Sequence, residues 1–347
     1  MEINFKKNII HIFWSFTSGG AEYLVKDISE NSSNLFNHTI IVINNHYDLD
    51  LVNSFKTNIK FILLNRKPST LNIKWFIKFI RSVLSIDNKI IHCHNYSLGY
   101  LIQIFFFTPK YLTVHGFDTQ LKSYKLFDKI VCVSYPLSNY IENKFNVKTI
   151  TILNGVNNKL IKIKKNYNKR IKLLFIGRFN DNIKGLDILI KAFKLVADQN
   201  DNVDLIIYGK GNKKSEYEYY IKSNDIDNRV FFKGLLNRKL VYDSLCRHDI
   251  SVIPSRKESF SLFAVESMMA KVPIIVSNIQ GLGEVSGKYS LKFETENSKD
   301  LANCIFRAMD EIKNNKIVSR TQMSFDYANS NYNMDLMLKN YNKLYKT

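Results

Sequence analysis

The chain has 347 residues, an apolar content of 45% and a formal net charge of +19. This length predicts two domains of ordinary size, and the apolar content is ample for two cores, which excludes a disordered chain. Four scattered cysteines without a C-x-x-C pair argue against a disulfide framework and a zinc knuckle, so we expect a reducing compartment.

The positive charge is concentrated in the first half of the chain. Residues 1–170 hold 23 Lys and Arg against 10 Asp and Glu, a net charge of +13, whereas residues 171–347 hold 27 against 21, a net charge of +6. The first half should therefore face an anionic partner. Nucleic acid, an anionic membrane surface and a phosphate-bearing substrate all satisfy this expectation.

Apolar runs alternate with loops and amphipathic stretches from the start of the chain. The first run, NIIHIFW, is short and interrupted by His11, so it indicates a buried strand and not a signal peptide. A helix from Ala21 follows, and then come HTIIVIN, IKFILL, a helix over 71–86, IIHCH, YLTVH, KIVCVS and TITIL. This rhythm is typical of a parallel sheet covered by helices on both faces.

A basic, Asn-rich stretch over 158–172 has the composition of a connector, and the same rhythm restarts after it. The second series is KLLFIG, a helix over 185–199, VDLIIYG, a helix over 214–223, VFFKG, a helix near 238–246, DISVIP, a helix over 261–270 and VPIIVS. Residues 333–346 predict a last amphipathic helix that could pack on either domain. The fold class is therefore α/β, with two tandem Rossmann-like domains. No window approaches the roughly 20 apolar residues of a membrane span.

The stretch SRKESFSLFAVESMMA, residues 255–270, sets two acids eight positions apart, Glu258 and Glu266. On one helix they would lie about 80° apart in azimuth and about 12 Å apart in height, too far to pair. We therefore place Glu258 in the loop after a strand, Ser259 or Ser261 at the helix N-cap, and Glu266 about a turn inside the helix. The amides of that helix start would form an anion site. The alternative for this window is a capping acid and an exposed helix acid.

Residues directly after the apolar runs are the candidate site, because ligands of doubly wound sheets bind beyond the carboxyl ends of the strands. Arg178 and Lys184 offer charge-assisted hydrogen bonds to a diphosphate. Glycines allow close approach of the backbone, and carboxylates accept hydrogen bonds from sugar hydroxyls. The positions that follow this rule are Gly19, Gly20, His115, Gly177, Arg178, Lys184, Gly209, Gly234, Glu258 and Glu266. Together they predict a nucleotide-diphosphate sugar held between two domains.

Each of these features also has an ordinary structural explanation. The stretch GKG has Lys214 where G-x-G-x-x-G requires its third glycine, so a nicotinamide site is not supported. The histidines at strand ends, His92, His94 and His115, are as readily structural as functional. Short acid pairs occur in polar loops, at Asp48 and Asp50 and at Asp225 and Asp227, and we expect no metal and no cofactor.

Taken in order, the motifs resemble retaining glycosyltransferases of family 4, which have the GT-B fold. The resemblance rests on SGGAE, TVHG, ILNGV, IGRFNDNIKG, IIYGKG, FFKG and PSRKESFSLFAVESMMAKVPIIVS, the last with the family's Glu-x7-Glu. It implies a deep cleft between an acceptor-binding domain, residues 1–160, and a nucleotide-sugar-binding domain, residues 161–325. A C-terminal helix, residues 326–347, would return to the first domain.

The resemblance also implies roles for the site residues. Arg178 and Lys184 would neutralise the leaving diphosphate, Glu258 would contact donor-sugar hydroxyls, Glu266 the ribose and His115 the donor sugar. The donor-binding set would be completed by Gly19, Gly20, Gly177, Gly209, Gly234, Ser259, Phe260, Ser261 and Leu262. The chain departs from the family's usual Glu-Gly-Phe-Gly at Ser259 and Ser261, and Ser261 adds a side chain where the sugar should approach.

The implied activity is transfer, with retention, of a hexosyl or N-acetylhexosaminyl group from a nucleotide-diphosphate sugar, with a UDP-sugar favoured. The acceptor would be a saccharide linked to a lipid diphosphate, in bacterial O-antigen or capsule biosynthesis. The rival functions are a nucleotide-sugar epimerase or phosphorylase on the same fold and a basic nucleic-acid-binding protein. We expect no nucleic-acid partner, because the apolar βαβ halves show no interleaving of basic and aromatic residues.

The predicted helix over 71–86 is both apolar and basic. It has an apolar face, which an ordinary Rossmann helix would bury, and a basic face with Lys74, Lys78 and Arg81. We expect burial of the apolar face. The basic face could still contact anionic headgroups, at about 1 kcal/mol per charge near the surface. The predicted location is the cytoplasm, with peripheral attachment to the inner face of the membrane.

Overall fold

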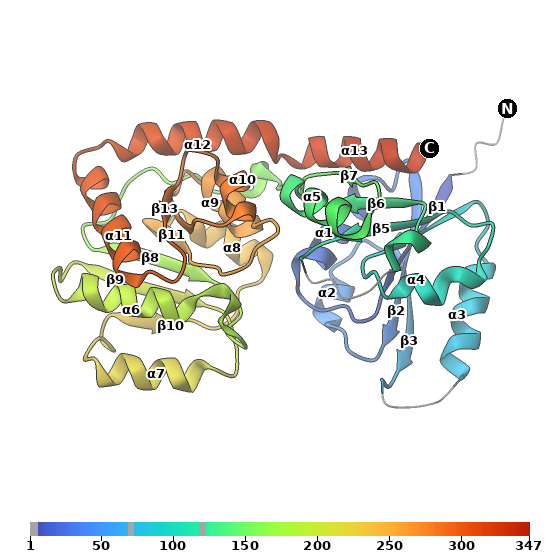
Figure 1. Ribbon diagram of the computed structural model, residues 1–347, viewed down its shortest axis with the longest axis horizontal. Coiled ribbons are helices and arrows are strands. Elements are labelled where there is room, and N and C mark those ends of the chain that lie inside the picture. Colours follow the sequence, from blue (N-terminus) through green and yellow to red (C-terminus); the bar gives the residue numbers. More distant parts are fainter. Residues whose placement is uncertain (1–5, 69–72, 118–122) are drawn as a thin grey trace. The chain divides into compact units, whose positions relative to one another are not determined.

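A computed structural model of the chain describes residues 6–68, 73–117 and 123–347 (Figure 1). It divides into two compact units, Met1–Gly155 with Met334–Thr347, and Val156–Asn333. The predicted limits, after residues 160 and 325, fall a few residues from these. Val156 pairs with Asn333 in an isolated bridge, and its N–H donates to the Tyr332 carbonyl at 2.8 Å, which holds both ends of the second unit together.

The first unit is built on a seven-stranded parallel sheet in the order β3-β2-β1-β4-β5-β6-β7. The strands are β1 (Lys7–Phe13), β2 (Phe36–Asn44), β3 (Lys60–Arg66), β4 (Lys89–Cys93), β5 (Lys110–Val114), β6 (Lys129–Cys132) and β7 (Ile150–Thr151). Its helices are α1 (Gly20–Asn31), α2 (Leu49–Asn53), α3 (Lys74–Leu84), α4 (Leu98–Leu101), α5 (Tyr135–Phe145) and α13 (Met334–Lys346). The strands are nearly continuous apolar runs because helices cover both faces of the sheet.

The second unit is built on a six-stranded parallel sheet in the order β10-β9-β8-β11-β12-β13. The strands are β8 (Ile171–Ile176), β9 (Val203–Tyr208), β10 (Val230–Phe232), β11 (Ile250–Ile253), β12 (Ile274–Ser277) and β13 (Leu291–Phe293). The helices are α6 (Leu186–Ala197), α7 (Lys214–Ser223), α8 (Arg238–Leu245), α9 (Leu262–Met269), α10 (Gln280–Ser286), α11 (Ser298–Lys313) and α12 (Ile317–Asn331). Two parallel α/β sheets confirm the predicted fold class.

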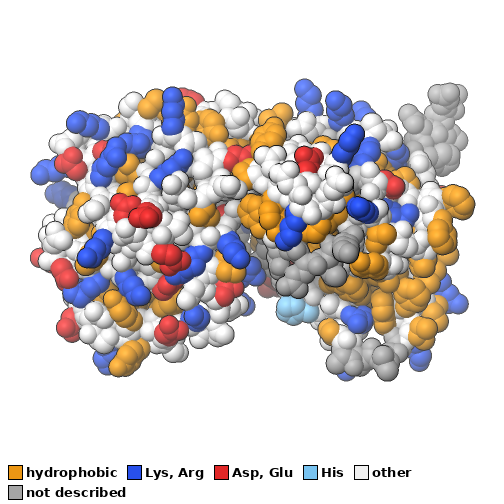
Figure 2. Space-filling view, in the orientation of Figure 1, with side chains coloured by type: hydrophobic (Ala, Val, Ile, Leu, Met, Phe, Trp, Pro, Cys, Tyr) orange, Lys and Arg blue, Asp and Glu red, His pale blue; other side chains and the backbone are white. Residues whose placement is uncertain are grey.

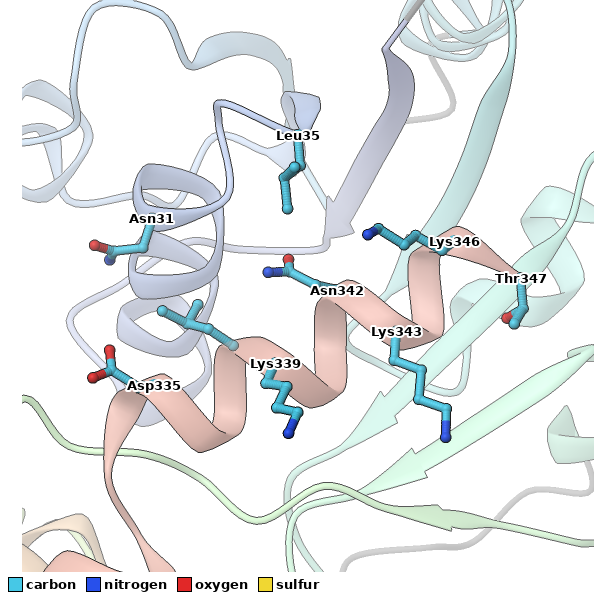
Figure 3. A pocket seen from close by; sticks show the side chains of 9 residues that line it. Asn31, Leu35, Asp335, Lys339, Asn342, Lys343, Lys346 and Thr347 are labelled. Carbon is cyan, nitrogen blue, oxygen red and sulfur yellow. The ribbon is translucent and has the colours of Figure 1, made fainter.

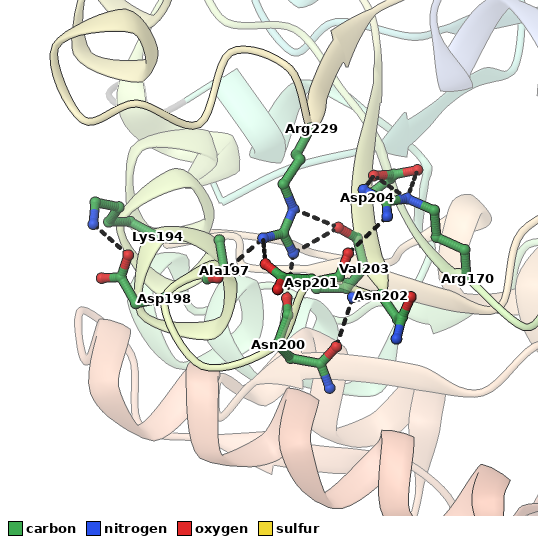
Figure 4. A network of polar contacts seen from close by, with 10 residues as sticks. All are labelled: Arg170, Lys194, Ala197, Asp198, Asn200, Asp201, Asn202, Val203, Asp204 and Arg229. Atoms are coloured by element: carbon green, nitrogen blue, oxygen red, sulfur yellow. Dashed lines mark hydrogen bonds and ion pairs between the residues drawn. The ribbon is translucent and has the colours of Figure 1, made fainter.

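A buried arginine joins two elements of the second unit (Figure 4). The Arg229 guanidinium donates to the carbonyls of Ala197 at 3.0 Å and Val203 at 2.9 Å, and also to that of Asn200. These carbonyls lie at the end of α6 and the start of β9, where helical or sheet partners are missing. Arg229 therefore stabilises the connection between α6 and β9.

Helix α3 buries less of its apolar surface than its sequence predicts, and residues 71 and 72 of the predicted helix lie outside the described residues. Phe79 and Val83 are fully buried, whereas Ile73, Ile77 and Leu84 are 64%, 44% and 59% exposed. The expectation of an ordinary buried apolar face is therefore wrong for these three positions. Periodicity reports which residues share a face, but not whether another element covers that face.

The last helix, α13, packs in the first unit. Met337, Tyr341 and Tyr345 are buried in a cluster that includes Ile9 and Phe36. An open groove of about 630 Å³ lies between α13 and the end of α1, lined by residues that include Asn31, Lys339 and Lys343 (Figure 3). This groove is at the amino-terminal edge of the sheet, away from the strand ends where ligands of such folds bind.

The described residues include no helix with the length and apolar content needed to cross a bilayer.

Candidate functional site

The candidate site of the second unit lies where its strand order reverses. β8 neighbours β9 on one side and β11 on the other, so the chain runs outward in both directions from this point. The loop after β8 carries Arg178 and Lys184, and the loop after β11 carries Glu258. In open α/β sheets this switch point is where the loops separate and leave a crevice. The rule that ligands bind beyond the carboxyl ends of strands therefore selects residues that follow two neighbouring strands, β8 and β11.

Lys184 and Glu258 form an ion pair at this point. Lys184 Nζ lies 2.6 Å from Glu258 Oε2, and the two side chains are 32% and 11% exposed. Lys184 ends a short 3-10 turn, η4 (Asn182–Lys184), in which the Asp181 carboxylate accepts from the Ile183 N–H at 3.0 Å. The pair therefore joins the loops of β8 and β11 through their side chains.

Gly185 allows the turn to lie against the end of β11. Its φ is +70°, and a Cβ at this position would stand 1.9 Å from the Pro254 carbonyl oxygen. A side chain here would meet backbone and would also be in the left-handed region that glycine tolerates best. Gly185 is not among the predicted site residues, although the sequence places it directly after Lys184.

Arg256 holds the same turn from the other side and was not predicted. Its guanidinium donates to both Asp187 oxygens at 2.8 Å and to Glu296, and its backbone N–H donates to the Ile183 carbonyl at 2.7 Å. Burial raises the pKa of Asp187, but hydrogen bonds and the charge of Arg256 outweigh it, so the pKa lies below its ordinary value. Hydrogen bonds to Asp187 and Glu296 raise the pKa of Arg256. Arg256 therefore remains charged and supports Lys184 without a direct contact.

Arg178 differs from Lys184 in its surroundings. Its side chain is exposed at the loop after β8, and among the described residues it makes no ion pair or hydrogen bond. An exposed guanidinium keeps all its donors available to an anion.

Helix α9 has the start that the sequence predicts. Ser261 is the N-cap, and its hydroxyl accepts from the Ala264 N–H at 3.3 Å, which makes Leu262 the first helical residue. Glu266 lies one turn inside the helix and is only 6% exposed, so the alternative of an exposed helix acid fails. Arg238 Nε lies 3.9 Å from Glu266 Oε1, and this buried carboxylate therefore has a nearby cation.

The backbone between Glu258 and α9 is closely packed. The Phe260 ring is buried and packs edge-on against Tyr332 with centroids 5.4 Å apart, whereas Ser259 is half-buried. A Cβ on Gly281 would lie 2.0 Å from the Glu258 carbonyl oxygen, so the start of α10 covers this loop. Phe260 can therefore contribute its amide to a ligand, but its side chain belongs to the core.

Three predicted glycines follow adjacent strands of the second sheet. The Gly177 N–H donates to the Tyr208 carbonyl at 3.0 Å, and the Gly209 N–H donates to the Gly234 carbonyl at 2.7 Å. A Cβ on Gly209 would lie 1.9 Å from the Gly177 oxygen, which explains the absence of a side chain there. Gly234 also has a positive φ, +75°, but faces open space.

The predicted residues of the first unit follow β1 and β5. Gly19 is the N-cap of α1, and Gly20 is the first helical residue. A Cβ on Gly19 would lie 2.7 Å from Glu22 Oε2, and the other Glu22 oxygen accepts from the Thr17 N–H at 3.2 Å. Gly19 therefore makes room for a carboxylate of its own loop. His115 is half-buried directly after β5, and burial lowers its pKa to about 4.

Residues 156–323 match the family "Glycosyl transferases group 1". Three relatives are similar to this chain in sequence, over different shares of their length. An uncharacterised glycosyltransferase of Methanocaldococcus jannaschii is 34% identical over 61% of each chain, and an uncharacterised 41.2 kDa protein in the cps region of Klebsiella pneumoniae is 27% identical over 98% of this chain and 99% of the relative. The O-antigen biosynthesis glycosyltransferase WclY of Escherichia coli is 28% identical over 52% of this chain and 51% of its own.

A solved structure resembles the whole chain. Anabaena HepE in complex with UDP and glucose superposes with a TM-score of 0.83 over 98% of this chain and 99% of its own, at 16% identity. At that identity the likeness concerns the fold alone. Through residues 156–323 the chain belongs to the group 1 glycosyltransferases, and its two units have the GT-B fold.

Proposed function

We propose that the chain transfers a glycosyl group, with retention, from a nucleotide-diphosphate sugar to a saccharide acceptor. The observation that carries this proposal is the Lys184 to Glu258 pair beside the exposed Arg178 at the strand-order reversal. Cations at this position suit a diphosphate, and a carboxylate suits sugar hydroxyls. UDP is the favoured nucleotide, since the similar Anabaena protein binds UDP and glucose.

The proposed reaction breaks the bond between the anomeric carbon and the leaving phosphate oxygen. The acceptor hydroxyl oxygen bonds to the same face of that carbon, and its proton passes to the departing phosphate. Negative charge grows on the diphosphate as the bond breaks, so Arg178 and Lys184 would bind the transition state more tightly than the ground state. Glu258 would orient the donor sugar, Glu266 would accept from the ribose, and the amides of Ser259 to Leu262 would complete the donor site.

In the first unit, His115, Gly19 and Gly20 are the proposed donor contacts. The proposal assigns no metal and no cofactor to the reaction, because two cationic side chains supply the positive charge that the leaving group needs.

The proposed acceptor is a saccharide linked to a lipid diphosphate, at an anionic membrane surface, in O-antigen or capsule biosynthesis. The similar Escherichia coli protein supports this pathway. Exposed apolar side chains occur at Ile73, the N-cap of α3, at Ile77 and Leu84 of α3, and at Phe106 and Phe107, which are 79% and 102% exposed. Phe79 of α3 packs on Phe105 with ring centroids 5.8 Å apart, so α3 contacts the chain directly before Phe106. Figure 2 shows hydrophobic side chains gathered over α3 and α4.

This apolar surface is bordered by exposed basic residues, Lys74, Lys78 and Arg81. Aromatic and aliphatic side chains beside basic ones favour an anionic bilayer interface. Vesicle flotation tests the surface: recovery should be higher with anionic than with neutral lipid and should fall on Phe106→Ser. Leu235→Ser, at an exposed site of the second unit, is the matched control. Equal recovery on both lipids contradicts the membrane proposal.

A thermal-shift panel of UDP-, GDP- and ADP-sugars tests the donor proposal. One UDP-sugar should raise the melting temperature, and the rise should shrink on Lys184→Ala. A panel without any shift contradicts the proposal. Product analysis with the nucleotide sugar that raises the melting temperature then separates the rival reactions. An epimerised nucleotide sugar formed without acceptor indicates an epimerase. A requirement for inorganic phosphate indicates a phosphorylase.

A further inference from the structure

An arginine of the first unit lies against both tryptophans of the chain. The guanidinium carbon of Arg66 is 5.7 Å from the ring centroid of Trp14 and 5.2 Å from that of Trp75, within the range of a cation–π contact. Arg66 ends β3, Trp14 directly follows β1, and Trp75 lies in the first turn of α3. All three side chains are half-buried. Arg66 and Trp14 therefore lie at the carboxyl ends of the strands, where ligands of such sheets bind.

A bulge in β3 brings Arg66 to this position. Val42 pairs with Leu63 and Asn44 pairs with Arg66, so β3 advances three residues where β2 advances two. The extra residue puts Asn65 at a φ of +54°, in the left-handed region that few residues with a side chain adopt. Without the bulge, Asn65 would pair with Asn44 in place of Arg66. Bulges re-aim side chains and are frequent beside functional sites.

Hydrogen bonds connect the strand ends around Arg66. Arg66 Nη1 donates to Asn44 Oδ1 at 3.1 Å, and the Asn44 N–H donates to the Trp14 carbonyl at 2.7 Å. The Trp14 ring N–H donates to Ser97 Oγ at 2.7 Å, and Ser97 is the N-cap of α4, after β4. The residues at the ends of four neighbouring strands, β3, β2, β1 and β4, therefore hold the guanidinium and the Trp14 ring in place.

The charge of Arg66 is not matched by the residues that the structure describes. Its two hydrogen bonds go to neutral acceptors, Asn44 and the Pro68 carbonyl at 3.3 Å, and its Nε is buried without a partner. In the described ranges no carboxylate pairs with it. Arg229, by contrast, donates to carbonyls from all three nitrogens, and Arg256 pairs with two carboxylates. A half-buried cation with donors to spare is a binding position for an anion.

The anion position lies beside the exposed apolar surface of α3. Trp75, which contacts Arg66, is followed one turn later by neighbours on the same helix that include Ile77, and Ile73 is the N-cap of this helix. Ile73 and Ile77 are 64% and 44% exposed. A diphosphate joined to a lipid chain carries both an anionic group for Arg66 and apolar surface for α3.

We propose that Arg66 binds a phosphate of the lipid diphosphate that carries the acceptor saccharide, and that it thereby determines which acceptors the protein accepts. This inference rests on the proposed function and concerns only residues of the first unit. A saccharide without the diphosphate would leave the Arg66 charge unmatched, so it should bind less tightly. The phosphate of an ordinary membrane headgroup has similar chemistry, and the experiments below separate the two sources.

Tryptophan fluorescence tests the site without any need for turnover, because both tryptophans of the chain lie against Arg66. The probe is farnesyl diphosphate, a water-soluble isoprenyl diphosphate, titrated into the full-length protein. We expect a saturable change in fluorescence, and Arg178→Ala should leave it intact. Absence of a change in the unsubstituted protein, or its loss in Arg178→Ala, overturns the proposal.

Arg66→Gln should raise the Kd for farnesyl diphosphate about 10- to 100-fold, the loss of hydrogen bonds to a charged group. Arg81→Gln is the matched control, since it removes the same charge from an exposed position of α3 and should change the Kd less than about threefold. Arg66→Lys keeps the charge without the planar fork, so its Kd should lie between those of the unsubstituted protein and Arg66→Gln. Equal effects of Arg66→Gln and Arg81→Gln, or a lysine that binds no better than glutamine, overturn the proposal.

Vesicles and kinetics distinguish the lipid diphosphate from other ligands. On anionic vesicles without a diphosphate lipid, Arg66→Gln should float like the unsubstituted protein, and a lower recovery would assign Arg66 to headgroups instead. With a lipid-diphosphate-linked acceptor, Arg66→Gln should raise the KM for the acceptor about 10- to 100-fold and leave the KM for the nucleotide sugar unchanged. A raised KM for the nucleotide sugar overturns the proposal. If no nucleotide sugar is turned over, the proposed function fails, and the fluorescence titration still decides the role of Arg66.

Discussion

Lys184 Nζ lies 2.6 Å from Glu258 Oε2, and this contact connects the loops that follow two neighbouring strands, β8 and β11. The pair has two consequences. Each side chain restrains the other at the point where the strand order reverses, and Glu258 partly offsets the positive charge of Lys184. A diphosphate would then meet one paired cation and one exposed cation, Arg178.

Glu258→Gln tests whether the site needs the negative charge of Glu258, because glutamine has nearly the same shape but no charge. The amide keeps an oxygen acceptor for Lys184 but loses the negative charge, so we expect kcat/KM for the nucleotide sugar to fall about 10- to 100-fold. Initial-rate kinetics with saturating acceptor measures this loss. Glu218→Gln is the control, because Glu218 pairs with Lys214 at 3.0 Å on an exposed helix face. An equal effect of both substitutions contradicts a site role for Glu258.

Gly185→Ala should disturb the site through the backbone. Its Cβ would stand 1.9 Å from the Pro254 oxygen at a φ of +70°, so the turn that carries Lys184 must move. Gly234 provides the control, since its φ is +75° but no atom lies within 4 Å of the added Cβ. Gly234→Ala should cost about 1–2 kcal/mol of unfolding free energy. Gly185→Ala should cost at least about 2 kcal/mol more in urea titrations.

Some features of the site could be predicted from the sequence, and others could not. The N-cap at Ser261, the loop position of Glu258 and most strands follow from local patterns and spacing. The contacts of Arg256 do not follow from local patterns, because its partners Asp187 and Glu296 are distant in sequence and are brought together only by strand order. α10 and β13 were also missed, since two glycines in a seven-residue helix and a three-residue strand leave little periodic signal.

The buried histidines of the first unit show a similar limit. His92 and His94 are two residues apart, which predicts a shared face for them at the strand end. The sequence does not say which ring each of them meets, because that depends on the order β2-β1-β4-β5. The exposed apolar residues of α3 could not be predicted either, since a helical pattern does not report whether a neighbouring element covers it.

The buried histidines should make stability depend on pH. Burial lowers the pKa of folded His38 from 6.5 to about 4, so the unfolded chain binds this proton first as the pH falls. Stability should therefore be lost between about pH 6.5 and pH 4, by about 1.4 kcal/mol per pH unit for one such residue. Urea midpoints across this range measure it. His38→Gln should flatten the slope, and His46→Gln, at an exposed position, should not; a slope that both leave unchanged contradicts the account.

Arg229→Met should destabilise the second unit without touching the site. The substitution leaves the carbonyls of Ala197, Asn200 and Val203 without their buried donor, and we expect a loss of about 2–4 kcal/mol of unfolding free energy. Arg170→Met is the control, because its guanidinium pairs with Asp204 but its side chain is 45% exposed, and it should cost less than about 1 kcal/mol. Similar midpoints for the two variants would show that Arg229 has no special role.

Turnover of Arg178→Ala and Lys184→Ala tests the central claim that these cations stabilise the leaving diphosphate. With the accepted UDP-sugar, each substitution should lower kcat about 10²- to 10³-fold while the circular dichroism spectrum stays unchanged. Lys194→Ala, which removes a lysine paired with Asp198 on α6, should leave kcat unaltered. Near-normal turnover in both site variants would contradict the account.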